Sequence, residues 1–334
     1  MAEILRKGID IRVRNIREFN IPYWEISSGK EGPCLLITAA LHGNEVNGCE
    51  VMRRFCPVAG EKLTRGKILM LPFANPPALW NRRHHVYSKP CEQKGSGQDN
   101  INRAWPGNPA GHEIEQLAFI IHEALVKQAT HNIDMHCWER FSPTAALVRD
   151  SEEHVKFARA AALPVLIVKE AVPRQGPPPS PCTLSNYFNC TGRVAFTVEF
   201  SGQYVLGERE INLGLRMLDN CSKYLGMFEG QLEGMDEPFF SKYGNTEEIK
   251  VEAHRSGLFV ESGLYPGDFV KKGDLLGTLF SDETLESDEV RAPAEGCLLS
   301  YGCRRRLSDV DLAAMHPYAE KGDSLAVIAG SQTG

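Results

Sequence analysis

The feature that most constrains this chain is a series of short apolar segments with amphipathic helical patterns between them. These segments occupy residues 34–40, 67–73, 132–137, 165–168 and 194–200. Nearly continuous apolar character over so few residues is typical of strands buried on both faces. The intervening helical periodicity is clearest over residues 112–128. Strands that alternate with helices predict an α/β fold with a mostly parallel or mixed central sheet flanked by helices.

The pattern changes near residue 240. After a last helical segment and a polar stretch, the chain from about residue 250 consists of short strand-like pairs separated by glycine-containing turns. Such spacing is typical of a small all-β unit. We therefore expect an α/β unit over residues 1–240 and an all-β unit over residues 250–334.

The second unit carries a more specific pattern. Its glycines, followed by the segment Ala-Pro-Ala-Glu-Gly at residues 292–296, resemble the barrel-sandwich fold of biotinyl/lipoyl carrier domains. Carrier domains present a modified lysine at a hairpin tip, and the corresponding residues 281–287 contain no lysine. The resemblance therefore implies the fold and not a swinging-arm carrier.

Charge, hydropathy and cysteine usage exclude several classes of protein. The 37 Lys and Arg against 43 Asp and Glu give a net charge of −6, which is no footprint for nucleic acid. No run reaches the roughly 18 apolar residues of a membrane span. Ten cysteines without a CxxC pair favour reduced thiols. We expect a cytoplasmic protein with a small-molecule substrate and no nucleic-acid or membrane partner.

A candidate metal site follows the first apolar segment. His42 and Glu45 stand three residues apart where a strand turns into a helix, although this spacing alone also occurs in surface loops. His136 ends another apolar segment, and Asp134 shares its strand face and can orient its ring. Imidazole and carboxylate are the ligands that catalytic zinc favours, and three of them leave a fourth position open. This predicts one Zn²⁺ per chain.

Further polar residues suggest catalysis and substrate binding. Glu199 lies within an apolar segment. Burying a carboxylate there costs free energy, so the residue should have a functional role or a partner. We expect it to act as general base, with a paired structural glutamate as the alternative. Asn102 and Arg103 offer an amide and a guanidinium fork to a substrate carboxylate, or else stabilise their loop. Candidates at the carboxyl ends of strands lie where open α/β sheets bind ligands.

These motifs together resemble one family. In order they are HGNE at 42–45, ANPPA at 74–78, NINRAWPG at 100–107, DMH at 134–136 and TVEF at 197–200. The series is similar to the succinylglutamate desuccinylase/aspartoacylase family, which is related to zinc carboxypeptidases. The resemblance covers about residues 30–230. It implies hydrolysis of the amide bond of an N-acyl amino acid, or of a related small carboxylate-bearing amide.

The resemblance also implies roles for single residues. Zn²⁺ would be bound by His42, Glu45 and His136. Glu199 would be general base and then acid to the leaving amine, and Asn102 with Arg103 would hold a substrate carboxylate.

An arginine after the ANPPA motif is implied to polarise the scissile carbonyl. Arg83 is nearest the expected position, and Arg82 is its rival. The chain departs from the family at residues 183–185, Thr-Leu-Ser, where many members carry an arginine. A second carboxylate clamp of the usual kind is therefore in doubt, and Arg174 or Arg193 are candidate substitutes.

Two other functions stay open. The first is a metallocarboxypeptidase acting on small peptides. The second is a non-enzymatic ligand-binding relative, which the complete set of His42, Glu45, His136 and Glu199 disfavours. Exposed strand edges in the all-β unit also make a homo-oligomer an expectation.

Overall fold

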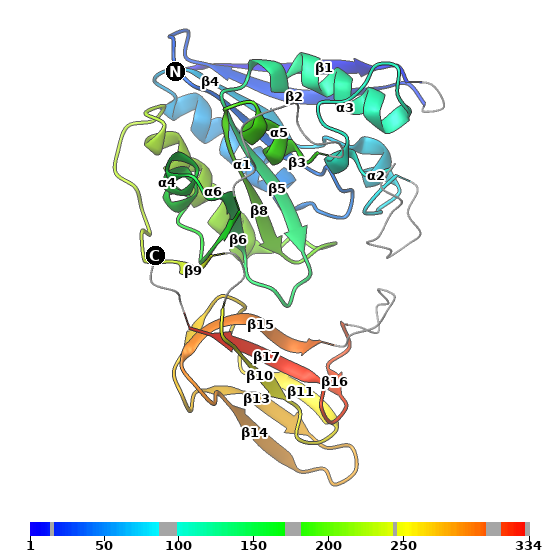
Figure 1. Cartoon of the computed structure of the whole chain (residues 1–334), viewed down its shortest axis with the longest axis vertical. Helices are drawn as coiled ribbons and strands as arrows, with labels where there is room; N and C mark the ends of the chain where they lie inside the picture. The colour runs from blue at the N-terminus through cyan, green and yellow to red at the C-terminus, as the bar shows by residue number, and fades with distance from the viewer. Residues whose placement is uncertain (14–16, 87–98, 171–181, 243–245, 305–314, 331–334) are drawn as a thin grey trace.

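A nine-stranded mixed sheet forms the centre of the first part of the chain (Figure 1). The computed structural model describes residues 1–13, 17–86, 99–170, 182–242, 246–304 and 315–330. The strand order is β1-β2-β4-β3-β5-β8-β6-β7-β9. The parallel centre consists of β4 (Lys67–Leu71), β3 (Cys34–Ala39), β5 (His131–Trp138) and β8 (Val194–Ser201). The expected α/β fold with a mixed sheet is confirmed.

The strand direction reverses beyond β8. β6 (Ala145–Arg149) runs antiparallel to β8 and parallel to β7 (Val165–Lys169), which in turn pairs in parallel with β9 (Phe239–Lys242). At the opposite edge, β1 (Glu3–Ile11) and β2 (Phe19–Ser27) form an antiparallel hairpin that joins the sheet through β4. The sequence patterns did not indicate β1, β2, β6 or β9.

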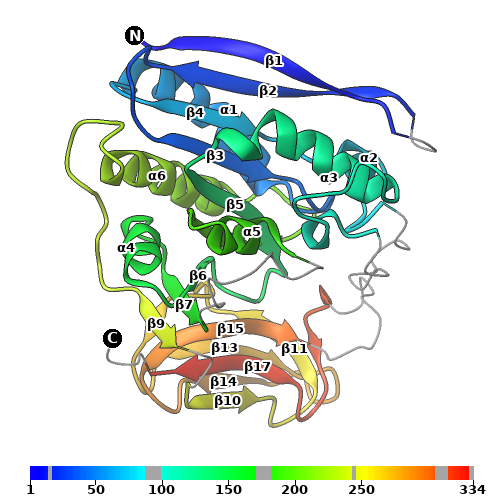
Figure 2. The ribbon, with the colours of Figure 1, turned by 45° about the horizontal axis from the view of Figure 1, so that its top comes forward.

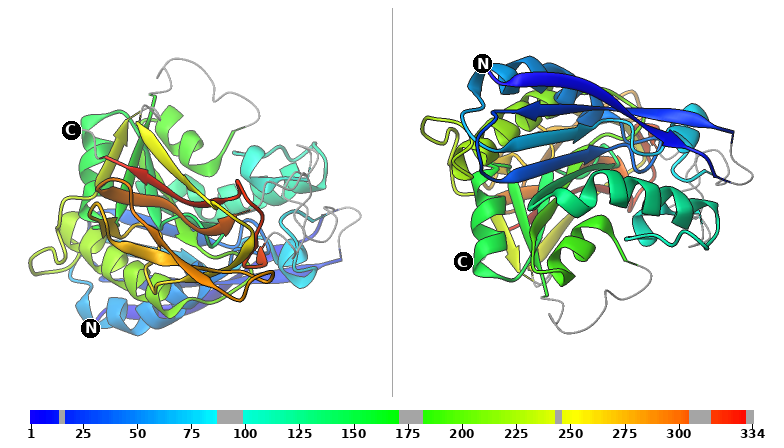
Figure 3. Two further views of the ribbon diagram at one scale, coloured as in Figure 1. Left: turned by 90° about the horizontal axis from the view of Figure 1, so that it is seen from below. Right: turned by 90° about the horizontal axis from the view of Figure 1, so that it is seen from above.

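Helices cover both faces of the sheet (Figures 2 and 3). One face carries α1 (Asn47–Lys62), α4 (Glu152–Ala160) and α6 (Glu208–Tyr224). The other carries α2 (Pro76–Trp80), α3 (Glu113–Ala124) and α5 (Leu184–Cys190), with 3-10 turns at Ile101–Arg103 and Val126–Gln128. Side chains alternate between the two layers, as a strand requires: Leu35 and Ile37 face the first, and Leu36 faces the second. No helix among the described residues is both long and apolar enough to cross a bilayer.

Two glycines allow the turn after β3 to lie close to its neighbours. A Cβ at Gly43 would come within 2.1 Å of the Ala78 backbone carbon at the start of α2. A Cβ at Gly48 would lie 2.8 Å from the Cβ of Ala39 and 2.9 Å from that of Met135. The backbone that follows β3 therefore packs directly against α2, and α1 begins close to β3 and β5.

The last part of the chain forms two antiparallel sheets of four strands each. One contains β10 (Glu248–Glu252), β17 (Ser324–Ala329), β15 (Gly296–Arg304) and β12 (Phe269–Val270). The other contains β14 (Ser287–Arg291), β13 (Leu275–Phe280), β11 (Gly257–Glu261) and β16 (Tyr318–Ala319). An apolar cluster that includes Phe259, Leu279, Leu298 and Ile328 fills the space between them.

The segment that follows β5 contacts these C-terminal sheets. Glu139 forms a salt bridge of 2.9 Å with Arg304, and Arg140 pairs with Glu261. The short connection between β9 and β10 joins the two parts of the chain.

The close approach at Gly43 predicts a cost for any added side chain. We expect Gly43→Ala to lower the free energy of unfolding by about 1–3 kcal/mol, because the methyl group must displace the α2 backbone. Urea denaturation measures the change. Gly330→Ala is the matched control, since a Cβ at Gly330 would meet no atom within 4 Å. Equal stability of the two variants would show that the turn accommodates a methyl group.

Candidate active site

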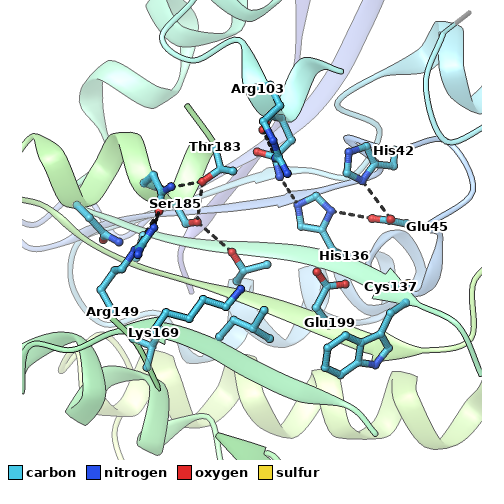
Figure 4. Close-up of a pocket in the computed structure, with 18 of the residues that line it drawn as sticks. His42, Glu45, Arg103, His136, Cys137, Arg149, Lys169, Thr183, Ser185 and Glu199 are labelled. Carbon is cyan, nitrogen blue, oxygen red and sulfur yellow. Dashed lines mark hydrogen bonds and ion pairs between the residues drawn. The ribbon is translucent and has the colours of Figure 1, made fainter. Parts of the chain in front are cut away.

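A cavity of about 310 Å³ opens at the carboxyl ends of β3, β5 and β8. Figure 4 shows its two differently charged ends. His42 and Glu45 lie at one end, and Arg149 and Lys169 lie at the other. The sheet therefore gathers side chains from distant parts of the sequence, as predicted for its carboxyl edge.

Two histidines share the carboxylate of Glu45. His42 Nδ1 lies 3.1 Å from Oε1, and His136 Nδ1 lies 2.7 Å from Oε2. All three side chains are buried, and their candidate ligand atoms lie within 4.8 Å of one another. His42 and Glu45 occupy the turn after β3, while His136 belongs to β5, the parallel neighbour of β3. The strand pairing thus brings together the three residues that the sequence proposed as metal ligands.

The second ring nitrogen of His136 and that of His42 also have hydrogen-bond partners. His136 Nε2 lies 2.9 Å from Asp134 Oδ2, and the hydroxyl of Thr38 donates to Asp134 Oδ1 at 2.7 Å. His42 Nε2 lies 3.1 Å from Asn100 Oδ1. Partners of this kind fix the ring orientation of metal-binding histidines and leave Nδ1 free for the ion.

The charges of this cluster complement one another. Burial disfavours ionisation of Glu45, but the charges of His42 and His136 outweigh it and hold the pKa of Glu45 well below its usual range. Burial also disfavours a charged His136, but Asp134 and Glu45 raise its pKa well above the usual value. The carboxylates of Glu45 and Asp134 thus favour positive charge at this end of the cavity. Two imidazole nitrogens and one carboxylate are the donor set of catalytic zinc sites, so these residues fit such an ion.

Glu199 lies beside this cluster. It is the register partner of His136 on the adjacent strand β8, and it lines the cavity. Burial raises the pKa of Glu199 to about 8, with His136 acting in the opposite direction. Among the described residues Glu199 forms no salt bridge, which disfavours a structural pair. A carboxyl group with such a pKa can take up and release a proton near neutral pH.

Asn102 and Arg103 lie in the 3-10 turn Ile101–Arg103 and both line the cavity. Asn102 is buried: its Oδ1 accepts from the backbone N–H of Leu184 at 2.9 Å, and its Nδ2 lies 3.1 Å from His136 Nε2. Arg103 is exposed, and its guanidinium donates to the Asn102 carbonyl at 2.6 Å. Asn102 therefore ties its turn to the start of α5, and Arg103 extends into the cavity without a carboxylate partner among the described residues.

The arginines that follow α2 are placed differently. Arg83 is half-buried and Arg82 is exposed, and neither lines this cavity. His84 lines it instead, with its ring stacked on that of His42 at 3.8 Å between centroids. The role of Arg83 as oxyanion stabiliser stays a prediction. Nothing in the sequence distinguished His84 from a surface histidine.

Sequence reasoning also missed the cations at the far end of the cavity. Arg149 ends β6 and Lys169 ends β7, and both line the cavity. Of the substitutes that the sequence suggested, Arg193 donates to the Val126 carbonyl at 2.6 Å and does not line this cavity. Arg174 lies outside the described residues. Only the order of strands in the sheet could have indicated Arg149 and Lys169.

Comparisons with known proteins point to one family. The family model of the succinylglutamate desuccinylase/aspartoacylase catalytic domain matches residues 31–225. A curated relative, N-alpha-acetyl-L-2,4-diaminobutyric acid deacetylase from Halomonas elongata, is 24% identical over an alignment of 319 residues that covers 92% of this chain and 85% of the relative.

Two solved structures share the fold. A succinylglutamate desuccinylase/aspartoacylase from Rhodobacter sphaeroides has a TM-score of 0.66 at 20% identity, covering 99% of this chain and 96% of that chain. The product-bound ectoine utilization protein EutE (DoeB) from Ruegeria pomeroyi has a TM-score of 0.64 at 21% identity, covering 98% and 95%. The likeness extends over the C-terminal sheets as well as the nine-stranded sheet.

The geometry around Glu45 predicts how metal content responds to substitution. We expect the purified chain to carry one zinc ion, and Glu45→Gln and His136→Ala to lose it, because each removes a charged or donor atom from a buried site. Asp134→Asn should weaken zinc binding by about 10–100-fold through the orientation of His136. Elemental analysis and chelator competition measure both effects.

His254→Ala is the control for metal content, since this exposed histidine pairs with Asp288 in the C-terminal part. One equivalent of tightly bound zinc in a Glu45→Gln, His136→Ala double variant would contradict the assignment of the ligands.

Proposed function

The chain belongs to the succinylglutamate desuccinylase/aspartoacylase family, and we propose that it is a zinc-dependent hydrolase that cleaves the amide bond of an N-acyl amino acid or a related small carboxylate-bearing amide. The observation that carries this proposal is the buried group of His42, Glu45 and His136 with Glu199 beside it in one cavity. The deacetylase from Halomonas elongata, named for an N-acetylated amino acid, supports the same class of substrate.

We assign the metal site and the proton transfer as follows. His42, Glu45 and His136 hold one zinc ion, which when bound would polarise the amide carbonyl and acidify a water molecule. Glu199 takes the proton of the attacking water at its carboxylate. It then delivers that proton to the amide nitrogen as the carbon–nitrogen bond breaks, so a carboxylic acid and an amine are released. Its raised pKa supports both halves of this transfer.

Other residues position the substrate in this proposal. Arg103 binds a substrate carboxylate through its guanidinium, and Asn102 holds the adjacent turn in place through the backbone N–H of Leu184. Arg83 remains our proposed stabiliser of the charge that develops on the carbonyl oxygen, because it follows the family's Asn-Pro motif. Closure of the α2 region onto the substrate would be needed to bring it there.

We further propose that the chain divides into a catalytic domain over residues 1–240 and a barrel-sandwich domain over residues 250–334. The two antiparallel four-stranded sheets around one apolar cluster support the second domain. The turn at 281–286 joins β13 to β14 and contains no lysine, so this domain would not serve as a biotinyl or lipoyl carrier.

Glu199 gives the sharpest test of the proton-transfer step. We expect Glu199→Gln to lower kcat by about 10²–10⁴-fold while zinc stays bound, because the amide cannot accept the proton of water. Glu210→Gln, at a half-buried carboxyl group on α6, is the matched control and should keep full activity. Activity in Glu199→Gln equal to that of the wild type would remove Glu199 from the mechanism.

A substrate panel separates amide deacylation from peptidase activity. We expect the wild-type enzyme to hydrolyse N-acetyl and N-succinyl amino acids, and a chelator to stop the reaction, because zinc is required. Amine release measured by derivatisation gives the rates. Faster cleavage of unblocked dipeptides than of any N-acyl amino acid would instead favour the metallocarboxypeptidase alternative.

A further inference from the structure

His84 and His85 place two more imidazole rings beside His42. They follow the helix α2, against which the turn after β3 packs at Gly43. The ring centroids of His42 and His84 lie 3.8 Å apart, those of His84 and His85 lie 4.4 Å apart, and those of His42 and His85 lie 5.3 Å apart. Of these three rings, only His42 has a role in the proposed hydrolysis.

The three rings have the donor arrangement of a metal site. One nitrogen from each ring lies within 4.8 Å of those from the other two, as is also true of the ligand atoms of His42, Glu45 and His136. His42 and His85 are buried, and His84 is half-buried and lines the cavity. An ion can therefore reach the rings from the cavity. Imidazole nitrogen is a favoured ligand of zinc, copper and nickel ions.

His84 and His85 also have the protonation state that a metal ligand needs. A histidine binds an ion through the lone pair of an unprotonated nitrogen, so the ring must be neutral. Burial, with a smaller effect from the charge of His42, lowers the pKa of His84 to about 3. The same two causes lower the pKa of His85. Near neutral pH an ion therefore displaces no proton from either ring.

The surroundings of His84 determine which of its nitrogens can bind an ion. Its Nδ1 lies 3.0 Å from Asn44 Oδ1 and 3.5 Å from Glu45 Oε1. Both neighbours are oxygen acceptors, so the hydrogen of the neutral ring belongs on Nδ1 and the lone pair on Nε2. Asn44 thus orients His84 as a hydrogen-bond partner orients a metal-binding histidine, and Nε2 is the atom that would bind the ion.

His42 is common to both groups and can serve only one of them at a time. Its Nδ1 lies beside Glu45 Oε1, and its Nε2 lies beside Asn100 Oδ1. A neutral imidazole has one N–H and one lone pair. An ion bound with Glu45 takes the lone pair at Nδ1, and the Nε2 hydrogen then points to Asn100. An ion bound with His84 would take the lone pair at Nε2, so the hydrogen would move to Nδ1.

We propose that His42, His84 and His85 form a second site for a divalent transition-metal ion, which binds Zn²⁺ when it is in excess and withdraws His42 from the first site. The first site has the negative charge of Glu45, with Asp134 behind His136, whereas the second has three neutral donors. The second site is therefore the weaker one. The site itself is independent of the proposed function, but the expected loss of hydrolysis on its filling rests on that function.

Zinc binding to the full-length wild-type chain tests the second site directly. In equilibrium dialysis against excess zinc we expect about two ions per chain, the second bound about tenfold or more weakly than the first. His84→Phe and His85→Gln should each keep the first ion and lose the second. Phenylalanine keeps a stacked ring but has no donor, and glutamine keeps a polar group but has no imidazole nitrogen.

His122→Phe is the matched control for these variants. The His122 side chain is 12% exposed, as is that of His84, and it packs edge-on against Tyr187 outside the cavity. This variant should bind both ions. A wild-type chain that saturates at one ion in excess zinc would overturn the second site. A second ion that persists in both His84→Phe and His85→Gln would overturn it as well.

The rate of amide hydrolysis shows whether the second ion withdraws His42. With the best N-acyl amino acid of the substrate panel, we expect the wild-type rate to fall by about tenfold or more as the second ion binds. The rate of His84→Phe, relative to its own rate with one ion, should stay constant over the same zinc concentrations. An unchanged wild-type rate with the second ion bound would overturn the withdrawal of His42.

Failure of the proposed function has a different signature. The wild type would then hydrolyse no amide, and a second ion that is lost in His84→Phe and His85→Gln would still support the second site. Conversely, hydrolysis that depends on one bound zinc ion, in a chain that takes up no second ion, would overturn the second site and leave the proposed function intact.

Discussion

The buried carboxylate of Glu45, shared between His42 and His136, is the interaction on which the rest of this site depends. A carboxylate that is 3% exposed is stable only if positive charge lies beside it, and both its oxygens face imidazole nitrogens. Because Asp134 stands behind His136, the cluster has more negative charge than the protein neutralises when the rings are neutral. A divalent cation between the three donors would resolve this imbalance, and this is the physical basis of the metal-dependent chemistry that we propose.

The topology of the sheet determines what surrounds this cluster. β3 and β5 are parallel neighbours, so the turn after β3 reaches His136, and β8 adds Glu199 in register with it. The reversed strand β6 then lines the part of the cavity farther from His42 and Glu45. It ends at Arg149, beside Lys169 of β7, so positive charge collects opposite Glu45. One sheet thereby separates the cluster around Glu45 from a cationic end within a cavity of about 310 Å³.

The sequence predicted those parts of the fold and site that local patterns encode. The central strands are apolar on both faces, and His42, Glu45, His136 and Glu199 stand at or near their carboxyl ends. The hairpin β1–β2 was missed because edge strands bury one face and alternate with charged residues. Arg149 and Lys169 were missed because they come together only through the pairing of β6 with β7. His84 was missed because its stacking on His42 depends on the close approach of Gly43 to α2. The placement of Arg83 relative to a bound substrate also lies beyond what sequence patterns encode.

The central claim is that this carboxylate cluster holds one zinc ion on which amide hydrolysis depends. Titrating zinc into chelator-treated wild-type protein, while hydrolysis of an N-acyl amino acid is followed, tests it most directly. We expect activity to rise in proportion to bound zinc and to reach its maximum at about one ion per chain. Hydrolysis at full rate by zinc-free protein, or a chain that binds no zinc, would contradict it.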